Sequence, residues 1–298
     1  MLTDAQKFAR GTDDKVVEVR SQRRMIWARF KRHRVAVVAA VVMLVMLVLV
    51  FAAPWIVRYK FDQLDMRHIR EAPSLVHLLG TDDLGRDLFT RILYGGRISL
   101  TIGIFSALVG TIIGTLLGAT AAYYGGMVDN IIMRITDVAF SIPSLPLLII
   151  LSSYAKSAIP AMVLIIGLLS WMPTARVVRG TVLSLKATDF TLAARTLGAR
   201  SSRIILRHIL PNAMAPIIVA ATLGVGGAII TESSLSFLGL GVQPPTPSWG
   251  NMLQDAQSTM ATKPWLTIFP GMAILITVLC VNFLGDGLRD ALDPTLRG

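Results

Sequence analysis

The sequence predicts an all-α polytopic membrane protein with six transmembrane helices and no soluble domain. Of its 298 residues, 53% are hydrophobic and only 16% are charged, and the mean hydropathy is +0.63. Soluble domains carry roughly 25% charged residues, so this chain has too much apolar surface for one water-soluble core. Its apolar residues also gather into runs long enough to cross a bilayer, and its basic residues are unevenly distributed between those runs.

Six apolar segments match the length of about 20 residues that a hydrocarbon core of about 30 Å requires. The first follows a tail that is too long and too charged for a simple signal peptide, so we expect the first span to be an uncleaved signal-anchor. In chain order, the expected spans are residues 35–57, 98–122, 131–154, 158–175, 214–235 and 267–285.

The distribution of Lys and Arg predicts which side of the membrane each loop faces. With both termini in the cytoplasm (N-in, C-in), 20 of the 29 basic residues are cytoplasmic and 9 are outside, in agreement with the positive-inside rule. The expected organisation is a cytoplasmic basic tail 1–34, a first transmembrane helix 35–57, an extracytoplasmic segment 58–97, a five-helix core 98–285 with a cytoplasmic loop 176–213, and a cytoplasmic tail 286–298.

The same asymmetry accounts for most of the net charge of +11. Neither a nucleic-acid-binding module nor a basic stripe interleaved with aromatic residues is recognisable, so we expect no nucleic acid partner. The densely basic stretch from Arg20 to Arg34 is either an amphipathic helix lying on anionic lipid or a solvated tail. The lone cysteine, Cys280, cannot form an intrachain disulfide, and we expect it to pack within the last span.

Glycines and prolines within the spans predict how the helices pack. Small residues on one face of the second span allow close backbone approach to a neighbouring helix, and they are Gly110, Gly114 and Gly118. Prolines in the third and fourth spans indicate kinks or span boundaries, and they are Pro143, Pro146, Pro160 and Pro173.

Asp137 and Glu232 are the carboxylates expected at membrane depth, where a charge costs about 2.5–3.5 kcal/mol on insertion scales. Asp137 follows Arg134 by three residues, so the two can pair on one helix face near the cytoplasmic boundary. Glu232 has no close basic neighbour in sequence and either hydrogen-bonds another helix or faces a translocation pathway. Both carboxylates are therefore candidates to line such a pathway.

The basic loop after the fourth span contains a short amphipathic helix. Asp189 can cap its first turn, its apolar positions recur at helical spacing, and Gly198 can end it. Such a short helix is marginal in water unless its apolar face is covered, so we expect that face to pack on its own bundle, in a partner's groove, or both. The apolar positions are Phe190, Ala193, Ala194 and Leu197.

This loop resembles the "EAA" loop of the membrane subunits of ABC importers. The resemblance lies in Leu192-Ala193-Ala194-x-x-x-Gly198 followed by His208-Ile209-Leu210-Pro211. The family pattern has Glu at the position of Leu192 and an aliphatic residue at the position of His208. Four further stretches, in the same order as in the family, are similar to the "C" permease of the peptide-importer branch: residues 77–87, 124–129, 236–250 and 285–294.

The resemblance implies the fold of a type I ABC-importer permease. It implies that the chain is a permease subunit for peptides (dipeptides or oligopeptides) or similar small solutes in a bacterial or archaeal inner membrane. The expected partners are a second, related permease, two cytoplasmic ATPase subunits that bind ATP and Mg, and an extracytoplasmic substrate-binding protein. The short helix would be the coupling helix seated in the ATPase. Relatives carry dipeptides, oligopeptides, glutathione or nickel chelates, so the solute stays open.

No catalytic signature is present in the sequence. The chain lacks the G-x-x-x-x-G-K-[ST] phosphate loop, H-E-x-x-H and G-x-S-x-G, and its four histidines are too dispersed to suggest a metal-ligand set. We therefore expect no enzyme activity and no cofactor in this chain. A self-sufficient secondary transporter or channel using Asp137 and Glu232 is the alternative, but it gives no reason for the short cytoplasmic helix. The chain also lacks the residues that an intramembrane enzyme would need.

Overall fold

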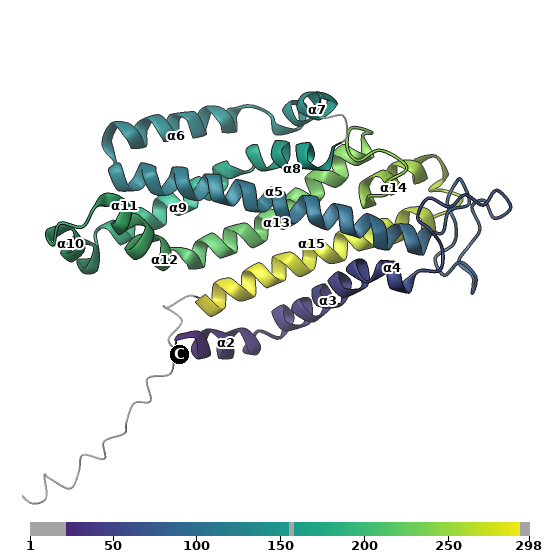
Figure 1. Cartoon of the computed structure of the whole chain (residues 1–298), viewed down its shortest axis with the longest axis horizontal. Coiled ribbons are helices and arrows are strands. Elements are labelled where there is room, and N and C mark those ends of the chain that lie inside the picture. Colours follow the sequence, from purple (N-terminus) through teal and green to yellow (C-terminus); the bar gives the residue numbers. More distant parts are fainter. Residues whose placement is uncertain (1–21, 155–157, 293–298) are drawn as a thin grey trace, which may run out of the picture.

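The computed structural model describes residues 22–154 and 158–292, which form an elongated bundle of helices (Figure 1). Within these residues no β-sheet forms, and a single isolated bridge joins Thr81 to Asp87. Four helices are long and apolar enough to cross a membrane: α3 (Arg34–Phe51), α5 (Leu88–Tyr124), α13 (Met214–Phe237) and α15 (Trp265–Leu292). The all-helical prediction is thus confirmed for the described part of the chain.

Two bent helix pairs raise the number of possible spans to six. The pair α6 (Gly126–Ser141) and α7 (Ser144–Tyr154) is bent by 86°, and the pair α8 (Ile159–Leu168) and α9 (Trp171–Lys186) by 45°. The remaining elements are α2 (Gln22–Arg32), α4 (Ala53–Ile56), α10 (Asp189–Thr196), α11 (Ser201–Arg203), a π-helical turn η1 (Ile204–Ile209), α12 (Leu210–Asn212), α14 (Trp249–Ala256) and η2 (Gln257–Thr259).

The third and fourth expected spans, 131–154 and 158–175, are therefore not continuous helices. Ile142 takes an extended conformation at the first break because Pro143 disfavours the helical conformation in the residue before it. At the second break, Pro173 lies in the first turn of α9, where a missing backbone N–H is tolerated. The prolines thus mark helix starts, and α9 runs on to Lys186, beyond the expected boundary.

The second expected span also begins earlier than hydropathy indicated. The side chain of Asp87 accepts a hydrogen bond from the backbone N–H of Thr90 at 2.9 Å and caps the first turn of α5. The end of the segment 58–97 is therefore helical from Leu88 onward. Residues 155–157, which the third and fourth spans were expected to flank, lie outside the described residues.

The close approach predicted for the glycine stripe of α5 is present, and Gly114 and Gly118 lie against α9. A methyl group added at Gly114 would lie 2.6 Å from the carbonyl oxygen of Trp171, and one at Gly118 would meet the carbonyl oxygen of Ala175. Only a hydrogen in place of the side chain allows the two backbones to lie this close. This contact joins α5 firmly to the helix that leads into the basic loop.

Figure 1 places the basic loop and both described chain ends at one end of the bundle. There α2 packs against the end of α15 through Phe30 and Ala291, both buried. The segment between α4 and α5, together with α14, lies at the opposite end. This arrangement is the one that an even number of crossings requires. Residues 1–21 and 293–298, which complete the two expected tails, lie outside the described residues.

Candidate functional site

The turn from α9 into the short helix α10 is fixed by two threonines. The hydroxyl of Thr188 donates to the carbonyl of Leu185 at 2.6 Å, and the hydroxyl of Thr191 donates to the same carbonyl at 2.9 Å. The residue before the helix is thus Thr188, whose backbone is extended, and Asp189 is the first helical residue. The expectation that Asp189 caps the helix was wrong by one position, although its charge still lies favourably in the first turn.

Gly198 ends α10, as its position in the sequence predicted. It has φ of +75°, and its N–H donates to the carbonyl of Arg195 at 3.0 Å. The N–H of Ala199 donates to the carbonyl of Ala194 at 3.1 Å. These two bonds form a Schellman motif, which satisfies two carbonyls at the helix end and favours glycine at the left-handed position.

The apolar face of α10 is divided between the bundle and the outside. Ala194 is half-buried against a core cluster that includes Val182, Ile204 and Ile209. Phe190, Ala193 and Leu197 point outward, with Phe190 41% and Leu197 87% exposed. The loop is therefore held by one side of α10, and the outward side presents these apolar residues, together with Leu192 at 49% exposed, largely uncovered by the described residues.

Lys186 and the π-helical turn η1 hold the loop against the end of α5. The ammonium of Lys186 donates to the carbonyl of Ala122 at 3.3 Å and lies 5.8 Å from the ring centroid of Tyr123. A cation at the carboxyl end of a helix is favourable because the last carbonyls lack helical partners. Ile204 and Ile209 of η1 are buried beneath the loop, so the base of α10 is rigidly seated.

Asp137 pairs with a different arginine from the one expected. Its carboxylate accepts a hydrogen bond from the guanidinium of Arg176 on α9 at 2.8 Å, whereas the sequence had suggested Arg134. Arg176 also lies over the ring of Phe140, 4.2 Å from its centroid. Sequence spacing could favour only a partner on the same helix, and the antiparallel neighbour α9 supplies a better one. The pair is about half exposed.

A second ion pair between α6 and α9 was missed altogether. Arg179 donates to both carboxylate oxygens of Asp129, each at 2.6 Å. The two residues are 50 positions apart, so no local pattern indicates that they meet. The forked geometry matches guanidinium to carboxylate and gives the stronger class of charged hydrogen bond.

Glu232 is fully buried and connects α13 to α5. Its carboxylate accepts hydrogen bonds from Ser99 at 2.9 Å and Ser236 at 2.7 Å. Ser99 in turn accepts from the N–H of Trp249 at 3.2 Å, and Ser236 accepts from the N–H of Val242 at 3.2 Å. Each hydroxyl has one hydrogen and directs it to the carboxylate. Of the two roles considered for Glu232, interhelical hydrogen bonding is the one present in this structure.

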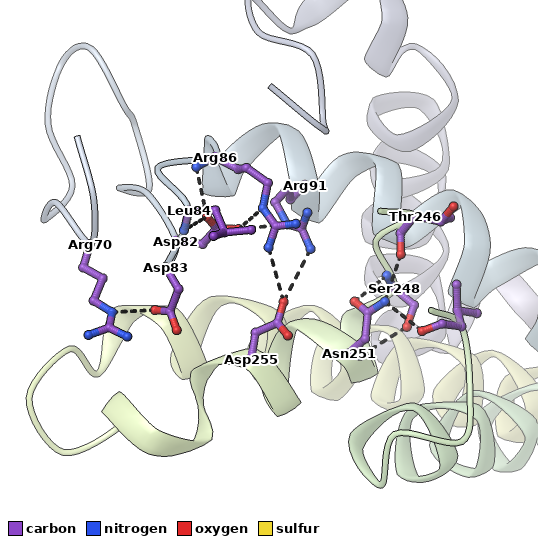
Figure 2. A network of polar contacts seen from close by, with 11 residues as sticks. Arg70, Asp82, Asp83, Leu84, Arg86, Arg91, Thr246, Ser248, Asn251 and Asp255 are labelled. Atoms are coloured by element: carbon purple, nitrogen blue, oxygen red, sulfur yellow. Dashed lines mark hydrogen bonds and ion pairs between the residues drawn. The ribbon is translucent and has the colours of Figure 1, made fainter. Parts of the chain in front are cut away.

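At the amino-terminal end of α5, a charged network joins that end and the segment before it to α14 (Figure 2). Asp82 accepts hydrogen bonds from Arg86 Nε at 2.6 Å and from the backbone N–H groups of Leu84 and Arg86, each at 2.9 Å. Buried Arg91 lies 3.3 Å from Asp82 and 3.7 Å from Asp255. Burial raises the pKa of the Asp255 carboxyl above its ordinary value, against the lowering influence of Arg91 and Arg86.

The start of α14 is held by a capping box, also visible in Figure 2. The hydroxyl of Ser248 accepts from the N–H of Asn251, whose side chain accepts from the N–H of Ser248 at 2.9 Å. The amide of Asn251 also donates to the carbonyl of Thr246 at 2.9 Å. The stretches 77–87 and 236–250 thus build the end of the bundle opposite to α10. Among the described residues, no three metal-ligating side chains gather.

Comparison with known protein families shows which family the chain belongs to. The family described as "Binding-protein-dependent transport system inner membrane component" matches residues 110–298. The chain belongs to this family. A second match, to the "N-terminal TM domain of oligopeptide transport permease C", covers residues 21–73 and therefore includes α2, α3 and α4. The permease is thus a multi-pass inner-membrane component of an ABC importer, and ATP hydrolysis belongs to separate subunits.

Curated relatives match the permease over nearly its whole length. The glutathione transport system permease protein GsiD of Pectobacterium atrosepticum is 47% identical over 280 residues, which cover 94% of this chain and 93% of that protein. GsiD of Escherichia coli O6:K15:H31 is 44% identical over 282 residues, with the same coverage of each chain. A self-sufficient transporter and an intramembrane enzyme are therefore set aside.

A solved structure supports the same fold. The MetNI methionine ABC transporter in inward-facing conformations matches with a TM-score of 0.54 at 20% identity. The match covers 68% of this chain and 96% of that one. The expectation of an ABC-importer permease fold is therefore confirmed.

Proposed function

We propose that the permease imports glutathione or similarly short peptides. The observation that carries this proposal is the identity of 44–47% to glutathione permeases over 94% of the chain. The match of the amino-terminal residues to an oligopeptide permease domain supports a peptide cargo in general. Dipeptides and longer peptides are the alternatives within the same class of solute.

A strain that lacks this gene tests the cargo directly. We expect uptake of labelled glutathione to be lost in the deletion strain and restored by the permease, because no other subunit would complete the pathway. A dipeptide and a longer peptide, measured in parallel, show whether the loss is selective. Unchanged uptake of all three solutes would contradict the proposal. Loss of uptake of the longer peptide alone would show that the longer peptide, and not glutathione, is the cargo.

In the proposed assembly, the permease pairs with a second, related permease and with two cytoplasmic ATPase subunits. A substrate-binding protein delivers the solute from outside. Residues Phe190, Ala193 and Leu197 of α10 dock on an ATPase, because they form an exposed apolar face on a helix that is otherwise well seated. Closure of the ATPases on ATP displaces α10, and the bundle then changes from inward-open to outward-open.

The pathway is proposed to run between the two permeases. Of the two carboxylates considered for it, Asp137 is the better candidate, because its side chain is 54% exposed whereas Glu232 is fully buried. In this conformation Glu232 holds the loop 238–248 against α5 and α13 instead. Its direct contact with a solute would require that loop to open.

The proposed orientation places α10 and both termini in the cytoplasm. Leu75, 94% exposed, lies in the segment expected outside, and Arg200 is exposed beside α10. In a Cys280→Ser background, we expect Leu75→Cys to react in intact cells with a membrane-impermeant thiol reagent, and Arg200→Cys to react only after the cells are permeabilised. The opposite labelling pattern would contradict the proposed orientation and place α10 outside the cell.

A further inference from the structure

Helix α6 is held to the bundle by very little packing. Of its 16 residues, all within the described part of the chain, only Thr136 is buried. Met127 is 78% and Val138 63% exposed, and Figure 1 shows α6 along the edge of the bundle beside α5. Helices in a membrane are held together by close packing and interhelical hydrogen bonds, so packing alone fixes the position of α6 weakly.

The connection between α5 and α6 is also permissive. It consists of Gly125, which is followed by Gly126 as the first residue of α6, and the two have φ of +67° and +53°. No atom lies within 4 Å of where a side chain on Gly126 would begin. Two successive glycines in left-handed conformations can change their backbone angles at low cost, so this connection can serve as a hinge for α6.

Two ion pairs hold α6 against α9, whereas its packing and the glycine hinge fix its position only weakly. Arg179 binds Asp129 with two bonds of 2.6 Å, and the Asp129 side chain is only 14% exposed. Arg176 binds Asp137 at 2.8 Å. Both arginines belong to α9 and both carboxylates to α6. Charge pairs of this kind gain strength where the surroundings are less polar than water.

The arginines lie on the helix that continues into α10. Only two residues separate Lys186, the last residue of α9, from the start of α10. The hydroxyls of Thr188 and Thr191 fix this turn by donating to the carbonyl of Leu185. A displacement of α10 therefore reaches α9 through the backbone and a rigid turn. The two ion pairs in turn connect α9 to the hinged helix α6.

We propose that Arg179 and Asp129 are positioning residues for transport, which fasten α6 to α9 so that α6 follows the movement of α10. Arg176 and Asp137 form a second, more exposed fastening. The proposal rests on the docking of α10 to an ATPase. Without the fastening, the ATPases would still bind and hydrolyse ATP, but α6 would no longer complete the change between inward-open and outward-open states.

The test uses the complete importer, with both permeases, the ATPases and the binding protein, in proteoliposomes. For Arg179→Asp we expect the number of ATP molecules hydrolysed per solute imported to rise roughly tenfold, within the usual range of coupling between sites. The charge-swapped variant, Asp129→Arg with Arg179→Asp, should recover most of the coupling. Asp290→Asn is the matched control, because Asp290 of α15 pairs at 3.7 Å with His33, the residue that caps α3, and this pair does not involve α6.

A distance measurement keeps the test decisive if Arg179→Asp assembles poorly. Spin labels at Val138 on α6 and Val41 on α3, both exposed, report the position of α6 before and after ATP is trapped. We expect the distance to change in the wild-type importer and to stay constant or become broadly distributed in the milder variant Arg179→Gln. An unchanged coupling ratio in Arg179→Asp, or a wild-type distance change in Arg179→Gln, would overturn the proposal.

Failure of this proposal is distinguishable from failure of the docking assignment. If the ion pairs are irrelevant but α10 docks on the ATPase, changes in α10 still abolish uptake while changes at Arg179 do not. If α10 does not dock, changes in α10 also leave uptake intact.

Discussion

Replacement of Gly114 by leucine is expected to prevent the bundle from assembling. The first added carbon would lie 2.6 Å from the carbonyl oxygen of Trp171 and 2.7 Å from the side chain of Thr174. Both neighbours belong to α9, and a backbone oxygen cannot move away as a flexible side chain can. We expect a cost of about 3 kcal/mol, the upper end of the usual range for overpacking, which is enough to depopulate the folded state of a marginally stable protein.

The yield and thermal stability of the detergent-extracted permease measure this effect. Gly180→Ala is the control, since Gly180 lies on α9 with no atom within 4 Å of the added carbon. Alanine is there expected to be neutral or stabilising because it favours a helix by about 1 kcal/mol over glycine. Wild-type yield and uptake in Gly114→Leu would show that α5 and α9 do not pack as described.

The second large effect is expected at Phe190. Phe190→Ala should abolish ATP-driven uptake while the permease still inserts into the membrane, because the side chain is 41% exposed and contributes little to the fold. Burial of a large apolar side chain in a partner is worth roughly 1.5–3 kcal/mol, so its loss weakens docking by a factor of about 10 or more. Gly198→Trp should act alike, because φ of +75° strains any other residue there.

Leu183 provides a matched control for Phe190. It lies on α9 and is also 41% exposed, so Leu183→Ala removes a comparable amount of exposed apolar surface outside the proposed docking face. Uptake of radiolabelled solute into proteoliposomes, normalised to the amount of permease inserted, compares the two variants. Normal uptake in both Phe190→Ala and Gly198→Trp would remove the basis for the coupling assignment.

The sequence predicted best those features that depend on a local pattern. Long apolar runs located α3, α13 and α15, because a membrane imposes one length and one polarity on any helix that crosses it. The glycine stripe of α5 indicated close packing, and Gly198 indicated the end of α10, since both are consequences of a missing side chain. None of these required knowledge of which helices are neighbours.

Predictions failed where the three-dimensional neighbour decides the outcome. Asp137 was matched to Arg134 on its own helix, but α9 brings Arg176 to it from 39 residues away. The Asp129–Arg179 pair gave no local signal at all. The same limit applies to Asp189, because the helix start is set by the preceding turn, where the hydroxyls of Thr188 and Thr191 both donate to the carbonyl of Leu185. Similarly, the prolines indicated bends but not their angles of 86° and 45°.

The most direct test of the coupling role is a photochemical cross-link from α10. A photoreactive residue placed at Leu197, which is 87% exposed on the proposed docking face, is irradiated in the purified importer with epitope-tagged ATPase subunits. A photoreactive residue at Leu44, on the exposed face of α3, serves as the control. We expect a product that contains the permease and an ATPase from position 197 and none from position 44. Cross-links from position 197 only to lipid or to the permease itself would contradict the assignment of α10 as the coupling helix.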